Sequence, residues 1–152
     1  MKLSLAIAAL VVSFSAQANV LVQYSRNAGF SPTPGSETIT IEDNGVVSFH
    51  SEYRNRADGQ VTVTDYVLAE LNSDRVAALK QLVPSIKQSD LKDQQEGQPL
   101  CTDAPSSSMT IPWGRRSVEF ARQASCHTWQ NNEPAAEQVR TLVEGLISLS
   151  NM

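Results

Sequence analysis

The chain has 152 residues, and its 16 acidic residues outnumber its 12 basic ones, giving a formal net charge of −4. The basic residues are scattered, and only Arg115 and Arg116 are adjacent, whereas nucleic-acid-binding proteins cluster Lys and Arg against phosphates. The same scarcity of basic clusters disfavours binding to anionic membrane surfaces. The length suits one domain with a working hydrophobic core.

The chain opens with the parts of a secretory signal peptide. Lys2 precedes an apolar run over residues 3–14, which is shorter than the roughly 20 residues that a spanning helix needs. Residues 16–18 (Ala-Gln-Ala) form a small-x-small cleavage site. We expect residues 1–18 to be removed, leaving a single domain over 19–152 in the periplasm or outside the cell. The alternative is a buried N-terminal helix.

The chain contains two cysteines, Cys101 and Cys126, and export would place both where disulfides form. Strand-like runs lie between them over residues 107–112 and 115–122. If these runs pair as a hairpin with Trp113-Gly114 as its two-residue turn, the register extends outward to set Cys101 opposite Cys126. We therefore predict a disulfide. A free thiol pair or a metal site is the alternative, but a metal site needs more ligands at short spacing.

Four strands are predicted in the N-terminal half, over residues 20–24, 37–41, 46–53 and 61–68. The second and third strands flank Asp43-Asn44-Gly45. Only a three-residue loop there keeps the apolar faces matched, pairing Ile41 with Val47 and Ile39 with Phe49. This register predicts a type I turn with a left-handed Gly45.

On the fourth strand we expect Val61, Val63 and Val67 to share one face. A helix should follow the cap residue Asn72 and end or kink at Pro84. Its apolar positions are Val76, Leu79, Leu82, Val83 and Ile86.

The polar residues 87–98 indicate a surface loop before the cysteine-flanked hairpin. A second helix should begin near Pro134. It carries an apolar stripe of Ala135, Val139, Leu142, Leu146 and Leu149. The order of four strands, a helix, two strands and a helix predicts an α+β fold, with an antiparallel sheet and both helices packed on one face.

Catalytic signatures are not evident in the sequence. We expect His50 to face solvent from a strand and His127 to lie in a loop, and no serine sits in a nucleophile elbow. Acidic residues such as Asp103 occur where they shape turns. We therefore expect no catalytic residues, no metal and no cofactor, and a hydrolase with a dispersed site is the less favoured alternative.

Two features are typical of binding surfaces. The loop of residues 26–35 combines an arginine, an aromatic residue, two prolines and two glycines, and a stiffened loop loses less entropy on binding. Trp113 is expected at a hairpin tip, and exposed tryptophans are common interface anchors. The alternatives are a plain surface connection for the loop and a structural role for Trp113.

The segment Tyr24-Ser25-Arg26-Asn27-Ala28-Gly29-Phe30 resembles the R-x-G-G-F start of the emfourin-type inhibitors of thermolysin-like metalloproteases. Ala28 stands in place of the first glycine, and the later order of helix, hairpin and helix is also similar. The resemblance implies that Arg26, Gly29 and Phe30 lie near the protease. This chain departs from the family in its leader and cysteines, because the family is mostly cytoplasmic and cysteine-free.

These observations together predict an exported binding protein whose partner is another protein. Its specific form would be a protease inhibitor acting through residues 26–35 on a metalloprotease. The alternative is an envelope structural or assembly factor that inhibits nothing.

Overall fold

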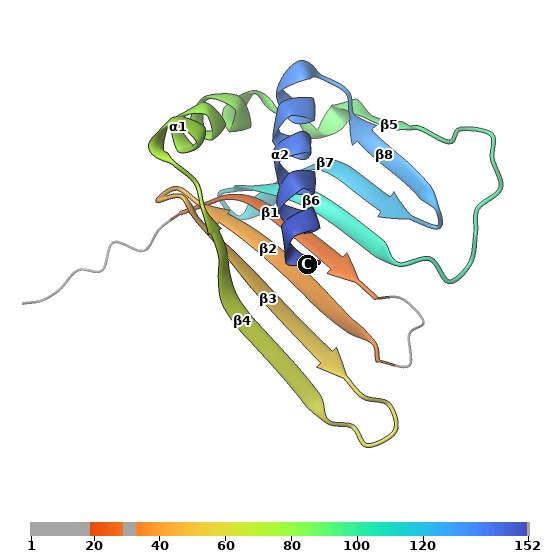
Figure 1. The fold of residues 1–152 in the computed structure, drawn as a ribbon. Helices are drawn as coiled ribbons and strands as arrows, with labels where there is room; N and C mark the ends of the chain where they lie inside the picture. Colours follow the sequence, from red (N-terminus) through yellow and green to blue (C-terminus); the bar gives the residue numbers. More distant parts are fainter. Residues whose placement is uncertain (1–18, 29–32, 152) are drawn as a thin grey trace, which may run out of the picture.

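A computed structural model describes residues 19–28 and 33–151. In this part of the chain eight strands form one antiparallel sheet in the spatial order β4-β3-β2-β1-β6-β7-β8-β5 (Figure 1). The strands are β1 (Val20–Asn27), β2 (Gly35–Glu42), β3 (Val46–Arg54), β4 (Val61–Glu70), β5 (Leu91–Asp93), β6 (Ser106–Trp113), β7 (Arg116–Ala124) and β8 (His127–Asn131). The helices are α1 (Ser73–Leu82) and α2 (Pro134–Ser150), with 3-10 turns η1 (Val83–Ser85) and η2 (Gln88–Asp90).

The predicted signal peptide, residues 1–18, lies outside the described residues. Neither helix in the described part of the chain has the length and apolar character that crossing a bilayer requires.

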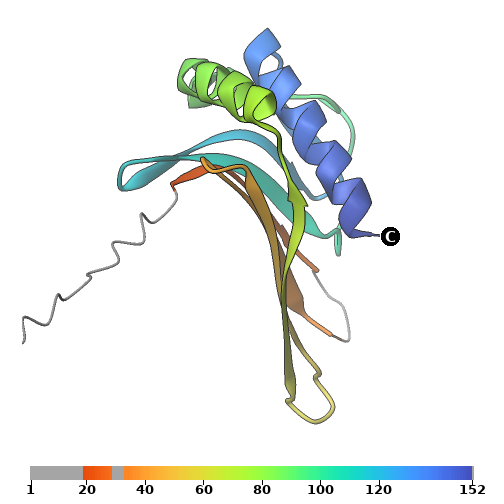
Figure 2. The same cartoon turned by 60° about the vertical axis from the view of Figure 1, so that its left-hand side comes forward.

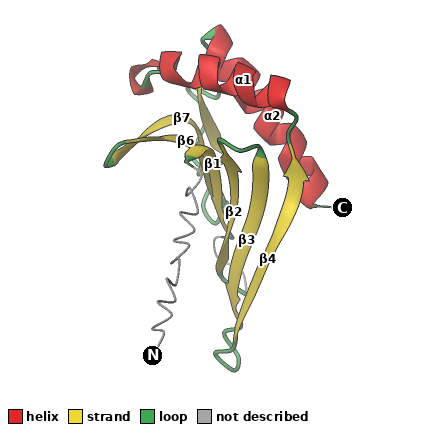
Figure 3. Cartoon of the chain, turned by 90° about the vertical axis from the view of Figure 1, so that its left-hand side faces the viewer, coloured by secondary structure: helices red, strands yellow, loops and turns green. Residues whose placement is uncertain are grey.

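Both helices lie on the same side of a strongly bent sheet (Figures 2 and 3). The core forms between them and the strands, and its fully buried side chains include Val22, Ile39, Ile41, Val47, Ile111, Phe120, Val139 and Val143. The six predicted strands and both helices are present in the predicted chain order. The short strands β5 and β8, which extend the far edge of the sheet, were not predicted.

The β2–β3 turn confirms the predicted register. Ile41 pairs with Val47 and Ile39 with Phe49, and Gly45 has the expected left-handed φ of 93°. A Cβ at Gly45 would also lie 2.7 Å from the carbonyl oxygen of Leu71. Glycine is therefore required there both by backbone conformation and by close packing.

The valines of β4 share one face, as predicted, but this face does not join the core. Val61, Val63 and Val67 are 44%, 53% and 60% exposed. The cause is the register, because Phe49 faces the helices and pairs with Tyr66, whose ring lies 4.9 Å from that of Phe49. The alternating valines consequently point to the face that the helices leave open.

The β6–β7 hairpin differs from prediction in its turn. Trp113 pairs with Arg116, so the turn residues are Gly114 and Arg115 rather than Trp113 and Gly114. Gly114 has a φ of 60°, as the first position of a type II′ turn requires. Next to the turn the true register is shifted by two residues, and an even shift leaves the side chains there on their predicted faces. A bulge between Met109 and Thr110 moves the rest of the hairpin by one further residue, so that Met109 pairs with Ala121 rather than Val118.

Strand β8 was missed because its turn lacks the usual glycine signal. Ser125 and Cys126 both have positive φ, 49° and 63°, which is the requirement of a type I′ turn. His127 is the first residue of β8, not a loop residue. The predicted surface loop over residues 87–98 likewise contains η2 and β5, and β5 pairs with β8.

The helices begin and end close to the predicted positions. The side chain of Asn72 accepts a hydrogen bond from the backbone N–H of Arg75 at 3.0 Å, and α1 ends at Leu82, before Pro84. In α2 the buried stripe is rotated from the predicted one, since Leu149 is 52% exposed. The buried residues are Ala136, Val139, Val143 and Leu146.

Candidate functional site

Four connections between strands leave the same end of the sheet, which we call the loop end. Their described residues are 28, 33–34, 55–60, 94–105 and 125–126. Strands β1 and β3 run towards this end, to the lower right in Figure 1. The opposite end of the sheet carries the β2–β3 and β6–β7 turns. The predicted binding residues are divided between these two ends.

Arg26 lies in β1, which corrects its predicted place in a loop. It is two residues from the loop end and pairs in the sheet with Glu37 on one side and Ser107 on the other. Its guanidinium Nη1 is 3.8 Å from Glu37 Oε2. The Arg26 side chain keeps 42% of its surface exposed, so the guanidinium stays accessible to a partner.

Tyr53 completes a cluster on this strand surface by donating a hydrogen bond from its hydroxyl to Glu37. Burial and the neighbouring Glu37 carboxylate raise the pKa of Tyr53 to about 12, because both disfavour a phenolate anion. The hydroxyl therefore remains a donor throughout the physiological range. Glu37 and Tyr53 were not singled out from the sequence, although the predicted β2–β3 register already placed them diagonally across the hairpin.

The connection between β1 and β2 is fixed at both of its described ends. The backbone N–H of Ala28 donates to the carbonyl of Gly35 at 3.0 Å, and that of Arg54 donates to the carbonyl of Pro34 at 2.9 Å. A Cβ at Gly35 would overlap the backbone oxygen of Glu52 and the ring of Tyr53. The loop therefore leaves the sheet from a closely packed base.

Two predicted binding residues, Gly29 and Phe30, lie outside the described residues. Trp113 is the last residue of β6 and is 58% exposed, as the prediction of an exposed hairpin residue requires. It sits six residues along β6 from Ser107, the partner of Arg26, which corresponds to about 20 Å of extended strand. The structure consequently does not bring Arg26 and Trp113 together.

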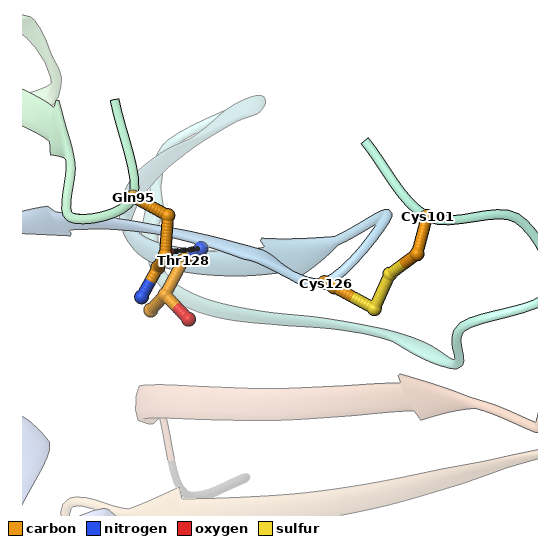
Figure 4. Close-up of a disulfide and its surroundings, with 4 residues drawn as sticks. All are labelled: Gln95, Cys101, Cys126 and Thr128. Atoms are coloured by element: carbon orange, nitrogen blue, oxygen red, sulfur yellow. Dashed lines mark hydrogen bonds between the residues drawn. A yellow bond between two sulfur atoms is a disulfide. The ribbon is translucent and has the colours of Figure 1, made fainter. Parts of the chain in front are cut away.

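Cys101 and Cys126 form a disulfide with a Cα–Cα distance of 5.6 Å, within the usual range for such bonds. The bond joins the β5–β6 connection to the β7–β8 turn (Figure 4). The backbone N–H of Cys101 also donates to the carbonyl of Ser125 at 3.2 Å. The predicted disulfide is present, but it lies beyond the paired part of the β6–β7 hairpin.

Further contacts hold the segment before Cys101 against β8. The backbone N–H of Thr128 donates to Gln95 Oε1 at 2.6 Å (Figure 4), and Gln95 N–H in turn donates to Asp93 Oδ1 at 2.9 Å. His127 Nδ1 lies 2.8 Å from Asp93 Oδ2. The disulfide, the amide bond and the histidine bond together fix this part of the loop end.

The pair of His127 and Asp93 has a distinct electrostatic character. The hydrogen bond to Asp93 is the main cause that raises the pKa of His127, with smaller contributions from the backbone at Pro99 and Gln98. Burial raises the pKa of Asp93, but hydrogen bonds from Gln95 and His127 outweigh it and leave that pKa lowered. The two side chains therefore favour the ion pair.

Histidine–aspartate pairs orient the base in hydrolase triads, and the described part of the chain contains two such pairs, His127 with Asp93 and His50 with Asp65. His127 is 5% exposed and its Nε2 is buried without a hydrogen-bond partner in the described structure. His50 Nδ1 lies 2.6 Å from Asp65 Oδ1 on the open face, with 47% of the His50 side chain exposed. Neither pair is hydrogen-bonded to a Ser or Cys nucleophile among the residues that the structure describes.

Within the described ranges, no group of three or more His, Cys, Asp and Glu side chains is placed to hold a metal ion. Neither the family models nor the curated proteins compared with this chain match it. The resemblance to emfourin-type inhibitors accordingly stays a prediction.

Proposed function

We propose that this chain is an exported binding protein that presents the β1–β2 connection at the loop end to a protein partner. The observation that carries the proposal is the fixed base of that connection, formed by the hydrogen bonds of Ala28 and Arg54 and the close packing of Gly35. A loop with a fixed base loses less conformational entropy when it is bound. Its two prolines, Pro32 and Pro34, restrict the chain further.

Arg26 supports this proposal through its position beside the loop. Its exposed guanidinium has one carboxylate neighbour, Glu37, at 3.8 Å, and an exposed pair at that distance is weak. Arg26 can therefore exchange Glu37 for an acidic group of a partner at small cost. Among protein partners, a thermolysin-type metalloprotease is the specific proposal, because the sequence of residues 24–30 resembles its inhibitors.

The disulfide supports the cellular location. A bond between Cys101 and Cys126 is compatible with the periplasm or the outside of the cell, since both allow disulfides to persist. Together with the predicted signal peptide, it supports an exported protein.

The test is a titration of the exported, oxidised protein against a thermolysin-type metalloprotease with a fluorogenic peptide substrate. We expect stoichiometric loss of protease activity. The double variant Arg26→Ala with Phe30→Ala should abolish the inhibition while the fold survives. Trp113→Ala is the matched control, since it removes an exposed aromatic side chain at the opposite end. Unchanged inhibition by the double variant, or none by the wild type, would rule the proposal out.

The alternative of an envelope assembly factor is favoured by one observation, the exposed valines of β4. Val61, Val63 and Val67 lie on an edge strand, and edge strands are templates for pairing with another chain. If the protein is an assembly factor, a Val63→Lys variant should lose its crosslinks to an envelope partner. If the proposal above is right, the variant should form the same crosslinks as the wild type. Crosslinking of the wild type and of the variant in the envelope therefore distinguishes the two functions.

A further inference from the structure

A cavity is lined by residues of α2 and of strands β1, β6, β7 and β8; Figure 1 shows how α2 crosses these strands. Its volume is about 160 Å³, enough for several waters or a small organic molecule. One part of its wall is apolar and is formed by Met109, Ala121 and Ile147. The remainder is polar, and this mixed lining is typical of small-molecule sites.

In the described part of the structure, three charged side chains line this cavity, Arg122, Arg140 and Glu144, and Arg140, on α2, is the most buried of them. Its side chain is 13% exposed, and its Nη1 is buried without a hydrogen-bond partner in the described structure. Guanidinium groups stay charged in proteins, and a buried donor without a partner is costly. An orphan donor of this kind requires an explanation.

Glu144 satisfies the charge and the hydrogen-bonding capacity of Arg140 only in part. Its Oε1 lies 3.6 Å from Arg140 Nε, and its side chain is 54% exposed, so water screens the attraction. The other arginine that lines the cavity, Arg122, is already engaged by Glu119 at 3.7 Å and by the ring of Trp129 at 4.7 Å. Among the described residues, Arg140 is therefore the arginine of this site that has a buried guanidinium nitrogen without a partner.

Neutral hydrogen-bonding groups also line the cavity. Ser107, Gln123 and Gln130 line the cavity together with Tyr24. Burial raises the pKa of Tyr24, and a hydrogen bond with Ser107 reduces that shift, so the phenol keeps its proton and can donate. These groups complement an anion without adding further charge.

We propose that this cavity binds a carboxylate group, with Arg140 as its charged partner and the neighbouring hydroxyl and amide groups as further donors. A carboxylate matches the planar fork of a guanidinium. Each of the two arginines that line the cavity already has a glutamate beside it, and this balance of charge suits a single negative charge better than the nearly double charge of a phosphate. The apolar wall suits a short aliphatic chain attached to the carboxylate. The site involves no residue of the β1–β2 connection, so a negative result for this proposal does not bear on the proposed function.

Two sources supply this chemistry, a free short-chain acid and the C-terminus of a peptide. The test is an NMR titration of the exported, oxidised protein with propionate and with N-acetyl-alanyl-alanine. Propionamide and the C-terminal amide of the peptide are the neutral controls. We expect saturable shifts around Arg140 and Gln130 with a carboxylate probe, and at least about tenfold weaker binding of its amide. The probe that binds identifies the source.

Variants test the role assigned to the charge. Arg140→Gln should weaken carboxylate binding at least about tenfold, whereas Arg116→Gln, an equal change of net charge at the other end of the sheet, should leave it unchanged. Glu144→Gln provides a second test that does not touch a buried group. It removes a competing carboxylate, so it should tighten binding severalfold. No saturable binding of either acid, equal binding of the amides, or weaker binding by Glu144→Gln would overturn the proposal.

Discussion

Removing the disulfide is the perturbation whose magnitude follows most directly from the structure. Cys101 and Cys126 are separated by 25 residues. For a loop of this length, the chain-entropy relation gives a stabilisation of about 3.5 kcal/mol. Domains of this size unfold with roughly 5–15 kcal/mol. The double variant Cys101→Ala with Cys126→Ala should therefore fold but lose a large share of its stability.

A local effect should accompany the global one. The β7–β8 turn holds Ser125 and Cys126 at positive φ, a conformation that costs about 1–2 kcal/mol for each residue with a Cβ. The disulfide and the hydrogen bond from Cys101 to Ser125 offset that cost. Without the disulfide, β8 should open more often than the central strands, and the amide of Thr128 should exchange faster with solvent.

Urea unfolding of the oxidised protein and of the double variant measures the difference in the free energy of unfolding. Chemical reduction of the wild type is the control and should shift the midpoint by a similar amount. A loss below about 1 kcal/mol would refute the loop-entropy argument. Equal exchange rates for Thr128 in both proteins would refute the claim that the disulfide holds the turn.

Two further predictions concern the loop end. Gly35→Ala should destabilise the protein by about 1–3 kcal/mol in urea unfolding, because the new Cβ overlaps the adjacent strand. Gly145→Ala is the control: its new Cβ meets no atom within 4 Å, so it should stabilise α2 by up to about 1 kcal/mol. An equal effect of the two substitutions would contradict the packing argument. An NMR titration should give His127 a pKa above the ordinary 6.5, and Asp93→Asn should return it towards that value. Because its pKa is raised, protonated His127 stabilises the folded state at low pH, and this contribution to stability is lost as pH rises through the raised pKa. The pKa of Asp93 is lowered, so the contribution of Asp93 to stability is lost as pH falls through that lowered pKa. A wild-type stability that does not decline as pH rises through the pKa of His127 would contradict this ion pair.

The sequence is informative where local pattern and turn chemistry act together. Asp43-Asn44-Gly45 requires one register, and that register predicted the pairing of Ile39 with Phe49. The helix beginning at Asn72 was predicted for the same reason, since a cap residue and an apolar period coincide there. Such signals are local, and tertiary packing did not override them.

The features that the sequence did not predict come from interactions between residues that are distant in the chain. The exposure of Val63 depends on the register of β4 against β3 and on which face of the sheet the helices cover, and neither is encoded in β4 alone. Strand β8 depends on a turn that the disulfide supports, without the glycine that usually marks a type I′ turn. Arg140 lies outside the predicted apolar stripe of α2, and only the packing of α2 on the sheet shows that its side chain is largely buried.

The candidate site, like the fold, was predicted only in part. Arg26 and Trp113 were predicted from residue type, and chain order alone gave no indication that they lie at opposite ends of the sheet. The predicted hairpin register already placed Glu37 near Tyr53, but Arg26 joins them only when β1 is placed beside β2.

The most direct test of the central claim is to find which end of the sheet contacts a protease. A photoreactive benzophenone amino acid would replace Phe30 in one protein and Trp113 in another, and each would be irradiated with a thermolysin-type metalloprotease. The account predicts a covalent complex from position 30 and none from position 113. A complex from position 113 alone, or from neither position, would contradict it.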